Sequence, residues 1–213
     1  MPVLNEAQGI RAALEALAPL RARGHEVIVA DGGSEDGTPE IARALCDRLV
    51  MAPRGRALQM NAGAREAKGN VLLFLHADTC LPADAPAHVT QSMETHQWGR
   101  FDVEIEGSHP LLKLVAWSMN LRSRLTGIAT GDQAIFVRRD AFPGFAAIPL
   151  MEDIAFSKVM KRRGRPVCLR SRVRTSGRRW EARGVLRTVL LMWRLRLAYA
   201  LGADPARLAE KYR

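Results

Sequence analysis

The stretch EVIVADGGSEDGT, residues 26–38, decides which fold this sequence can adopt. Residues 27–30 form a short apolar run, which is typical of a β-strand that is buried on both faces. Asp31 follows directly, and a glycine-rich loop then leads to Thr38, where the hydroxyl and the proline after it predict the start of a helix. A strand, an acid, a loop and a helix in this order place a ligand at the carboxyl end of a parallel sheet.

Asp31 has two interpretations at this point. Its carboxylate can accept hydrogen bonds from the base edge or a sugar hydroxyl of a ligand. Alternatively, the turn is an ordinary connection between strand and helix, and Asp31 only caps it. Because the acid precedes the glycines, the motif is neither a dinucleotide-binding fingerprint nor a P-loop.

The composition indicates one globular domain with an anionic partner. The 213 residues are 47% hydrophobic and 25% charged, which is enough for a buried core and excludes a disordered chain. An excess of 32 Lys and Arg over 22 Asp and Glu gives a formal net charge of +10. This charge favours a nucleic acid, a phosphate-bearing ligand or a membrane surface as partner. Aromatic residues make up only 6% of the chain, so RNA binding by base stacking is the less favoured choice.

The cysteines and the hydropathy pattern predict a cytoplasmic protein. Cys46, Cys80 and Cys168 are an odd number without paired spacing, which argues against a disulfide framework or a zinc site. We expect neither a secretory signal nor a membrane-spanning helix, since no apolar run reaches the roughly 18 residues that spanning requires.

Apolar runs and helical periods alternate along the first half of the chain. Buried strands are predicted at residues 27–30 and 71–75, with helices before and after each of them. This alternation predicts an α/β fold with a mostly parallel twisted sheet that is flanked by helices. Asp31 and Asp78 each follow one of these strands, so we expect both carboxylates at the same edge of the sheet.

The second half has a looser pattern. We expect a strand over residues 100–106, a short strand at 167–169 and a basic, turn-like segment at 171–180. A long helix over residues 183–201 mixes Leu, Val, Met and Trp with arginines. It could pack on the domain, pack on a partner, or lie on an anionic membrane.

Several motifs, in this order, resemble those of family 2 glycosyltransferases of the GT-A fold. They are PVLNE (residues 2–6), VADGGSEDGT (29–38), GR (55–56), NAG (61–63), LHADT (75–79), GDQ (131–133) and ED (152–153). The segment TSGRRW (175–180) is similar to the bacterial branch of arsenosugar-biosynthesis-type glycosyltransferases.

The resemblance implies a domain organisation and an activity. Residues 1–180 would form a GT-A domain, with a nucleotide-binding half (1–82) and an acceptor half (83–180) that share a single, mostly parallel sheet. Helices over residues 181–213 would pack on this domain. Such an enzyme moves a sugar from a nucleoside diphosphate sugar, with UDP as the expected nucleotide, to an acceptor hydroxyl.

The resemblance also implies a donor site. The residues that it assigns to nucleotide-sugar binding are Pro2, Asn5, Glu6, Asp31, Gly32, Ser34, Arg56, Asn61, His76, Ala77, Asp78, Arg179 and Trp180. Asp78 would hold a divalent cation, Mn²⁺ or Mg²⁺, that bridges the carboxylate and the diphosphate. His76 stands where the family has a further Asp, and we interpret it as a supporting residue and not as a metal ligand.

Asp153 matches the general base of similar inverting enzymes. It would accept the proton of the acceptor hydroxyl during a single displacement, with Glu152 in support and Asp132 and Gln133 on the acceptor side. We therefore expect Asp153 to face Asp31 and Asp78 across one pocket. Simpler interpretations stay open: the acids cap a helix, Arg179 is a solvated charge, and Trp180 packs in the core.

Other functions also stay open. The chain could be a catalytically inactive module that binds a nucleotide sugar or a glycan, or, as a less favoured reading, a basic protein that binds RNA or a membrane. We expect a small-molecule donor, an unknown acceptor and no nucleic acid, and we leave peripheral membrane contact and a homo-oligomer open. The first strand is short for the family pattern, so we expect upstream residues or an unusual contact to complete it.

Overall fold

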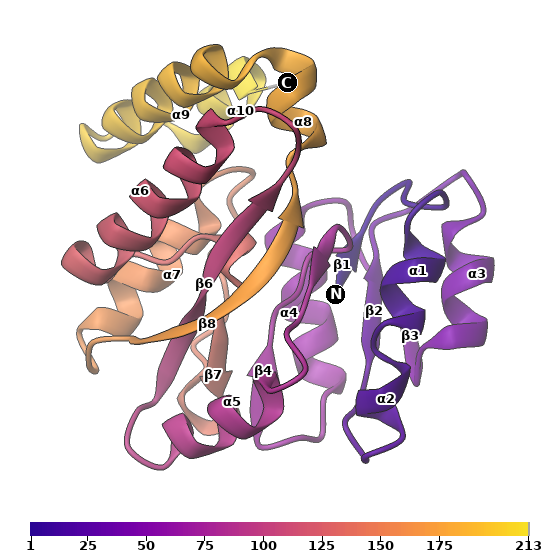
Figure 1. Cartoon of the computed structure of the whole chain (residues 1–213). Coiled ribbons are helices and arrows are strands. Elements are labelled where there is room, and N and C mark those ends of the chain that lie inside the picture. Colours follow the sequence, from indigo (N-terminus) through magenta and orange to yellow (C-terminus); the bar gives the residue numbers. More distant parts are fainter. Residues whose placement is uncertain (213) are drawn as a thin grey trace.

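The computed structural model describes residues 1–212 and has an α/β architecture (Figure 1). The strands are β1 (Pro2–Val3), β2 (Ile28–Asp31), β3 (Arg48–Met51), β4 (Val71–Leu73), β5 (Thr79–Cys80), β6 (Trp98–Glu106), β7 (Phe136–Arg138) and β8 (Val167–Ser176). The helices are α1 (Ile10–Glu15), α2 (Ala18–Arg21), α3 (Thr38–Leu45), α4 (Arg56–Glu66), α5 (Ala85–Met93), α6 (Leu111–Thr126), α7 (Glu152–Lys161), α8 (Arg178–Arg183), α9 (Val185–Ala200) and α10 (Pro205–Tyr212). Two short 3-10 turns are η1 (Gly131–Gln133) and η2 (Arg139–Ala141).

Strand β2 is buried on both faces, as its apolar run predicts. It lies between β1 and β3 in a parallel sheet. Val29 belongs to the same core as Ile10 and Leu14 of α1. On α4, which packs against β2, a Cβ added at Gly63 would lie 3.7 Å from side-chain atoms of Ile28 and Ala30. Since successive side chains of a strand point to opposite faces, helices cover both sides of this sheet.

The other strands form a mixed sheet in the order β4-β7-β6-β8-β5. Strands β6 and β8 are parallel, whereas β7 runs antiparallel to β4 and β6. The expected single sheet is instead divided into two sheets, between β1 and β4. Strand β1 pairs with β2 through only two residues, and the described residues contain no ladder that joins β1 to β4.

A cavity of about 1020 Å³ lies at this division. Apolar side chains of β2, α4, β4 and α5 line it, among them Ile28, Leu72 and Val89. The amine of Met1 donates a hydrogen bond to the carbonyl of Ile28 at 2.8 Å. Burial lowers the pKa of this amine to about 5, although the nearby thiol of Cys46 opposes the shift. Polar side chains such as Gln59 and Lys68 also line the space, but most of its surface is apolar.

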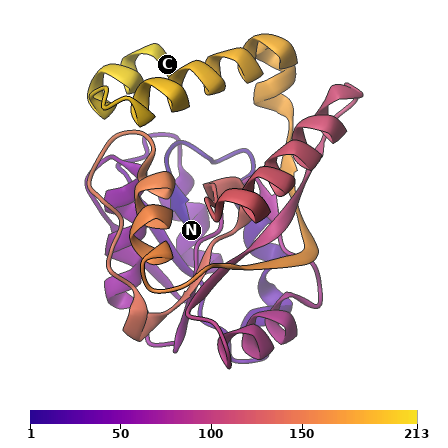
Figure 2. The ribbon, with the colours of Figure 1, turned by 90° about the vertical axis from the view of Figure 1, so that its left-hand side faces the viewer.

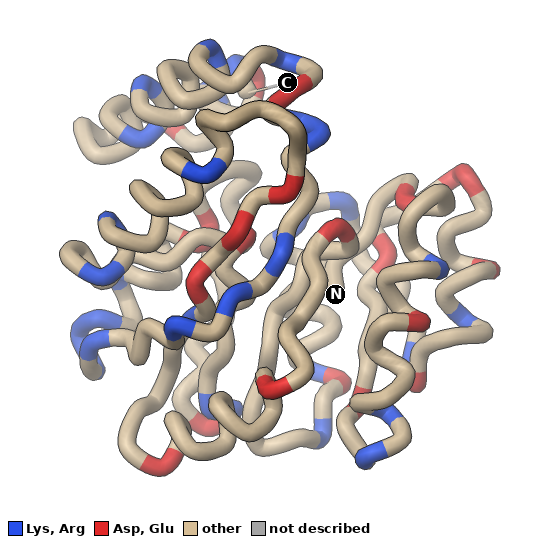
Figure 3. Tube along the Cα trace, viewed as in Figure 1, with Lys and Arg blue, Asp and Glu red and all other residues tan. Residues whose placement is uncertain are grey.

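The prediction of a turn-like segment over residues 171–180 is wrong for most of that segment. Strand β8 continues to Ser176, and α8 begins at Arg178. Arginines and buried residues alternate in this part of β8, which is the period of a half-exposed strand. Arg172 and Arg174 lie 3.9 and 3.4 Å from carboxylates of Glu104 and Glu106 on β6. Figure 3 shows the acidic and basic positions side by side along the two strands.

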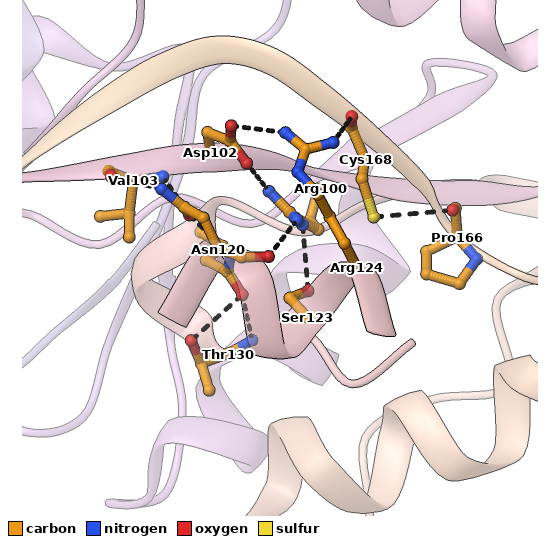
Figure 4. A network of polar contacts seen from close by, with 10 residues as sticks. Arg100, Asp102, Val103, Asn120, Ser123, Arg124, Thr130, Pro166 and Cys168 are labelled. Atoms are coloured by element: carbon orange, nitrogen blue, oxygen red, sulfur yellow. Dashed lines mark hydrogen bonds and ion pairs between the residues drawn. The ribbon is translucent and has the colours of Figure 1, made fainter. Parts of the chain in front are cut away.

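A buried polar network holds α6 against β6 (Figure 4). The guanidinium of Arg100 pairs with Asp102 and donates to Ser123 Oγ of α6 at 3.0 Å. Arg124 of α6 donates to the other oxygen of Asp102 at 2.5 Å, and Asn120 bonds with both backbone groups of Val103 at 2.9 Å. Because buried charges are costly unless they are paired, this network and the buried Leu112, Val115 and Met119 favour the same side of α6 toward the sheet.

The C-terminal helices lie across one end of the molecule (Figures 1 and 2). Leu195 of α9 and Leu208 of α10 form a small core with Leu150, Met151 and Ile154, which lie just before and within α7. Within residues 1–212, no helix combines the length and the apolar character needed to cross a bilayer.

Candidate active site

The loops that follow β1 and β2 are joined by hydrogen bonds. Asn5, whose φ of 54° is left-handed, donates its amide to Ser34 Oγ at 2.8 Å and accepts from the amide of Glu35 at 2.9 Å. The amide of Glu6 donates to Thr38 Oγ1 at 2.8 Å. These bonds bring the carboxyl ends of the two strands to one edge, as a parallel pair requires.

The segment that follows β4 reaches the same edge. Burial and the negative charge of Asp78 raise the pKa of Glu6, whereas the guanidiniums of Arg178 and Arg179 oppose the rise. Asp78 and the two adjacent arginines, from two distant parts of the chain, therefore lie near Glu6. Asp36 of the loop after β2 also raises the pKa of Glu6, so this loop lies near Glu6 as well, and a shared edge for Asp31 and Asp78 stays a prediction.

Asp31 itself is buried and bonded within its own loop. Its Oδ1 accepts hydrogen bonds from the amides of Gly33 and Ser34 at 2.8 Å, and its Oδ2 accepts from Ser34 Oγ at 2.6 Å. Gly33 has a φ of +86°, which suits glycine in such a turn. These bonds support the interpretation in which Asp31 stabilises the turn, and a contact with a base stays a prediction.

The two acids at the start of α7 face α4 and η1. Arg56 Nη1 lies 3.2 Å from Glu152 Oε1. Burial and the neighbouring Asp153 raise the pKa of Glu152, and Arg56 opposes this rise. Asp153 Oδ2 accepts a hydrogen bond from the amide of Gly131 at 3.0 Å, while its Oδ1 accepts from the amide of Ile154 at 2.7 Å. Both acids therefore lie in the first turn of α7, where a negative charge is favourable, and Asp153 also contacts the acceptor-side loop.

His76 closes the arrangement from the side of β4. Its Nδ1 lies 3.4 Å from Asp132 Oδ1. Burial acts to raise the pKa of Asp132, but His76, with further help from Arg56 and Arg179, holds it below its usual value. A Cβ at Gly131 would lie 2.5 Å from His76 Cε1, so the ring can lie here only because residue 131 is glycine.

A cavity of about 10 Å³ lies between these groups, large enough for about one water molecule. Arg56, His76, Glu152 and Asp153 line it together with apolar residues that include Phe74 and Phe145. Neither Asp31 nor Asp78 lines it. Of the three aspartates expected around one pocket, only Asp153 lines this cavity, with His76 from the segment after β4, so the cavity is not the expected shared pocket.

Four residues expected in the site have other contacts. Asn61 donates to the carbonyl of Phe145 and accepts from its amide, both at 2.8 Å. Gln133 is buried and donates to Asn120 Oδ1 at 3.3 Å. Trp180 packs against the main core, and Pro2 pairs with Ala30 in the sheet. We leave these four residues out of the proposed site, because the structure gives each of them a structural role.

Three residues near the site were not among those expected there from the sequence. Gln59 of α4 is buried and donates to the carbonyls of Val3 and Ala30, at 2.5 and 3.1 Å. Tyr212 accepts a hydrogen bond from Arg179 at 3.0 Å. Two nitrogens of Arg122, Nε and Nη2, are buried without a hydrogen-bond partner among the described residues. Of the three, only Gln59 could have been found from the sequence, because it is a glutamine on a helix face that is otherwise apolar and buried.

The residues present fit a divalent cation that is shared with a diphosphate. Within the part of the chain that the structure describes, no three His, Cys, Asp or Glu side chains are arranged to hold a metal ion. Asp78 is exposed at the edge, and Thr79 Oγ1 is 3.3 Å from its Oδ1. Mg²⁺ commonly binds one or two carboxylates and completes its ligands with water and phosphate oxygens.

Solved structures of low sequence identity show which fold this chain has. Glucosyl-3-phosphoglycerate synthase from Mycobacterium tuberculosis, in complex with Mn²⁺, UDP and glucosyl-3-phosphoglycerate, is 17% identical with a TM-score of 0.59, over 80% of this chain and 68% of that one. TarS 1–349 of S. aureus is 17% identical with a TM-score of 0.65, over 83% of this chain and 59% of that one. The predicted α/β class and GT-A fold are confirmed by this likeness.

Residues 1–111 match the model of the family described as glycosyl transferase family 2, and the chain belongs to this family. Among curated relatives, glycosyltransferase AglE of Haloferax volcanii is 36% identical over 91 residues, which are 38% of this chain and 30% of that protein. A PGL/p-HBAD biosynthesis glycosyltransferase of Mycobacterium bovis is 35% identical over 105 residues, 46% of this chain and 41% of the relative. The matched region spans less than half the length of these relatives.

Proposed function

We propose that the chain is a glycosyltransferase that moves a sugar from a nucleoside diphosphate sugar, with UDP as the expected nucleotide, to an acceptor hydroxyl. The observation that carries this proposal is the pair Glu152 and Asp153. It lies opposite the segment after β4, with Arg56 3.2 Å from Glu152. Family membership and the UDP-bound similar structure support it.

The donor would lie over the edge formed by the loops after β1, β2 and β4. Asp31 and Ser34 shape the loop that we expect to contact the nucleoside, and Glu6 and Asp78 lie beside it. Arg179 is exposed near Glu6, where its planar guanidinium could bind phosphate oxygens in a bidentate manner. A divalent cation held by Asp78 and the diphosphate would neutralise charge on the leaving group.

Asp153 is the proposed general base. Burial raises the pKa of Glu152, which disfavours its ionised form, so we assign the proton-accepting role to Asp153. Its carboxylate would take the proton of the acceptor hydroxyl as that oxygen bonds to the anomeric carbon and the bond to the diphosphate breaks. One such displacement inverts the anomeric configuration. Asp132, held by His76, would bind the acceptor.

The test begins with a thermal-shift screen of nucleoside diphosphates and their sugars, with and without Mn²⁺, because a ligand that binds only the folded state raises its stability. The best donor then enters an assay of nucleoside diphosphate release. Asp153→Asn should abolish release and retain donor binding, whereas Asp78→Ala should weaken donor binding. Unchanged turnover in Asp153→Asn would remove Asp153 as the base.

A catalytically inactive module that binds a nucleotide sugar or a glycan is the second candidate. It is favoured by the small volume beside Asp153, about 10 Å³, and by the lack of a cluster of three metal ligands in residues 1–212. Calorimetry with UDP and Mn²⁺, run beside the release assay, separates the two candidates. Binding without any turnover would support the module.

Several finer assignments are proposals of the same kind. They are membership of the arsenosugar-biosynthesis branch, a cytoplasmic location, the lack of a nucleic-acid partner, an oligomeric state and peripheral membrane contact. The division into residues 1–180 and 181–213 also belongs here, and its last residue lies outside the described part of the chain. A steep salt dependence of RNA affinity, without nucleotide binding, would favour the nucleic-acid alternative.

A further inference from the structure

Helix α9 has a continuous exposed apolar stripe. Its members, spaced three or four residues apart, are Leu186, Leu190, Trp193, Leu197 and, just after the helix, Leu201. The opposite side of the helix is the packed one, with Val185 and Leu195 buried. An apolar stripe on each side is unusual for a surface helix, which normally presents polar residues to water.

Helix α6 has a stripe of the same kind. Leu114, Trp117, Leu121 and Leu125 are exposed, again at helical spacing, while the polar network of Asn120, Ser123 and Arg124 faces β6. The two helices contact each other, and Figures 1 and 2 show them at the end of the molecule that is far from α1–α3. Trp117 is 60% exposed and Trp193 is 70% exposed, so two large aromatic side chains on adjacent helices lie in water.

The charges of these helices have one sign. Each helix has 16 residues, and neither contains an Asp or a Glu. The six basic residues that they contain are Lys113, Arg122, Arg124, Arg187, Arg194 and Arg196. Lys113, Arg187 and Arg194 are exposed beside the stripes. Leucine, tryptophan and arginine together are typical of helices that lie in a membrane interface.

We propose that α6 and α9 dock on the surface of an anionic lipid bilayer. The leucine and tryptophan side chains enter the boundary between headgroups and acyl chains, and the exposed basic residues bind lipid phosphates. Because no helix of the described residues could cross a bilayer, the two helices lie in the plane of the interface. The proposal does not depend on the sugar-transfer reaction, since it uses none of the site residues.

A second copy of the chain fits this face less well. In a symmetric dimer the same patch meets itself. Such a dimer would bring the basic residues of both copies together without an acid from either helix to pair with them. Like charges across an interface are unfavourable, whereas an anionic bilayer supplies the opposite charge.

Cosedimentation with vesicles tests the proposal. The full chain should bind vesicles of equal parts phosphatidylcholine and phosphatidylglycerol, bind pure phosphatidylcholine much less, and release as salt rises. The double variant Arg187→Gln/Arg194→Gln should partition about 30-fold more weakly, because each arginine near an anionic surface contributes about 1 kcal/mol and 1.4 kcal/mol is a factor of ten. Leu190→Gln and Leu121→Gln should also weaken binding.

Met51→Gln is the matched control, because Met51 is 60% exposed but lies on β3, away from both helices. It should leave vesicle binding unchanged. Quenching of tryptophan emission by brominated lipids in the unaltered chain is an independent readout, since it needs no variant to fold. The proposal is overturned if anionic vesicles are not bound at low salt, or if Met51→Gln weakens binding as much as Leu190→Gln. It is also overturned if the chain forms dimers that Leu190→Gln disrupts while vesicles bind neither form.

Discussion

The Nη1 atom of Arg56 lies 3.2 Å from Oε1 of Glu152 and joins the start of α4 to the start of α7, across 96 residues of sequence. The two side chains differ in exposure, at 40% for Arg56 and 3% for Glu152. The pair therefore places a nearly buried carboxylate beside a partly hydrated cation. Burial and the neighbouring Asp153 raise the pKa of Glu152, and Arg56 only partly offsets this rise.

Glu152→Gln should make the protein more stable at neutral pH and reduce its loss of stability as pH rises. Burial and Asp153 raise the pKa of Glu152 in the folded state. The folded state therefore binds more protons than the unfolded chain between the usual and the raised pKa, and stability falls as pH rises through that window. Urea unfolding of both proteins from pH 4 upward measures the difference. If the free energy of unfolding falls with pH equally steeply in both proteins, ionisation of Glu152 does not destabilise the folded state.

Gly131→Ala should disturb the site and reduce activity without disrupting the fold. The added methyl would lie 2.5 Å from His76 Cε1, so the His76 ring must move away from Asp132. We expect a loss of nucleoside diphosphate release of about tenfold or more, since a small misplacement of site groups is costly. Gly9→Ala is the control, because nothing lies within 4 Å of the position of its added Cβ. Normal activity of Gly131→Ala would mean that the contact between His76 and Asp132 is dispensable.

The cavity between β2 and β4 predicts the effect of residues added before Met1. About five apolar residues with high β propensity should raise the melting temperature, because an added strand would bury apolar surface between Ile28 and Leu72. A Gly-Ser extension of equal length is the control and should change little. If both extensions have the same effect, the cavity does not take a strand.

Arg122→Met should raise the stability of the folded protein. The Nε and Nη2 atoms of Arg122 are buried without a partner among the described residues, and burial followed by repulsion from Arg196 lowers the pKa of Arg122 to about 10. Methionine keeps much of the side-chain volume without the unpaired groups, so we expect a gain of about 1–3 kcal/mol. Denaturant unfolding measures it, with the exposed Arg187→Met as control. A destabilised Arg122→Met would show that the guanidinium has a favourable partner.

Patterns local to the chain were sufficient for the α/β class and for the strand and loop around Asp31. The apolar run before Asp31 and the glycines after it predict β2 and its loop, because burial on both faces and a tight turn each leave a mark within a few residues. The acids at 152 and 153 likewise stand where a helix begins. The ordered motifs identified the family, to which the match over residues 1–111 assigns the chain.

Contacts between distant segments could not be obtained in this way. The bonds of Asn61 with Phe145, the burial of Gln133 and the position of His76 beside Asp132 depend on how α4, α6 and the loops pack. The length of β8 depends on its ladder with β6, since an exposed basic strand resembles a loop until its partner is known. Hydrophobic periodicity reports which residues are buried, but the partner that each polar group meets is decided only when the layers come together.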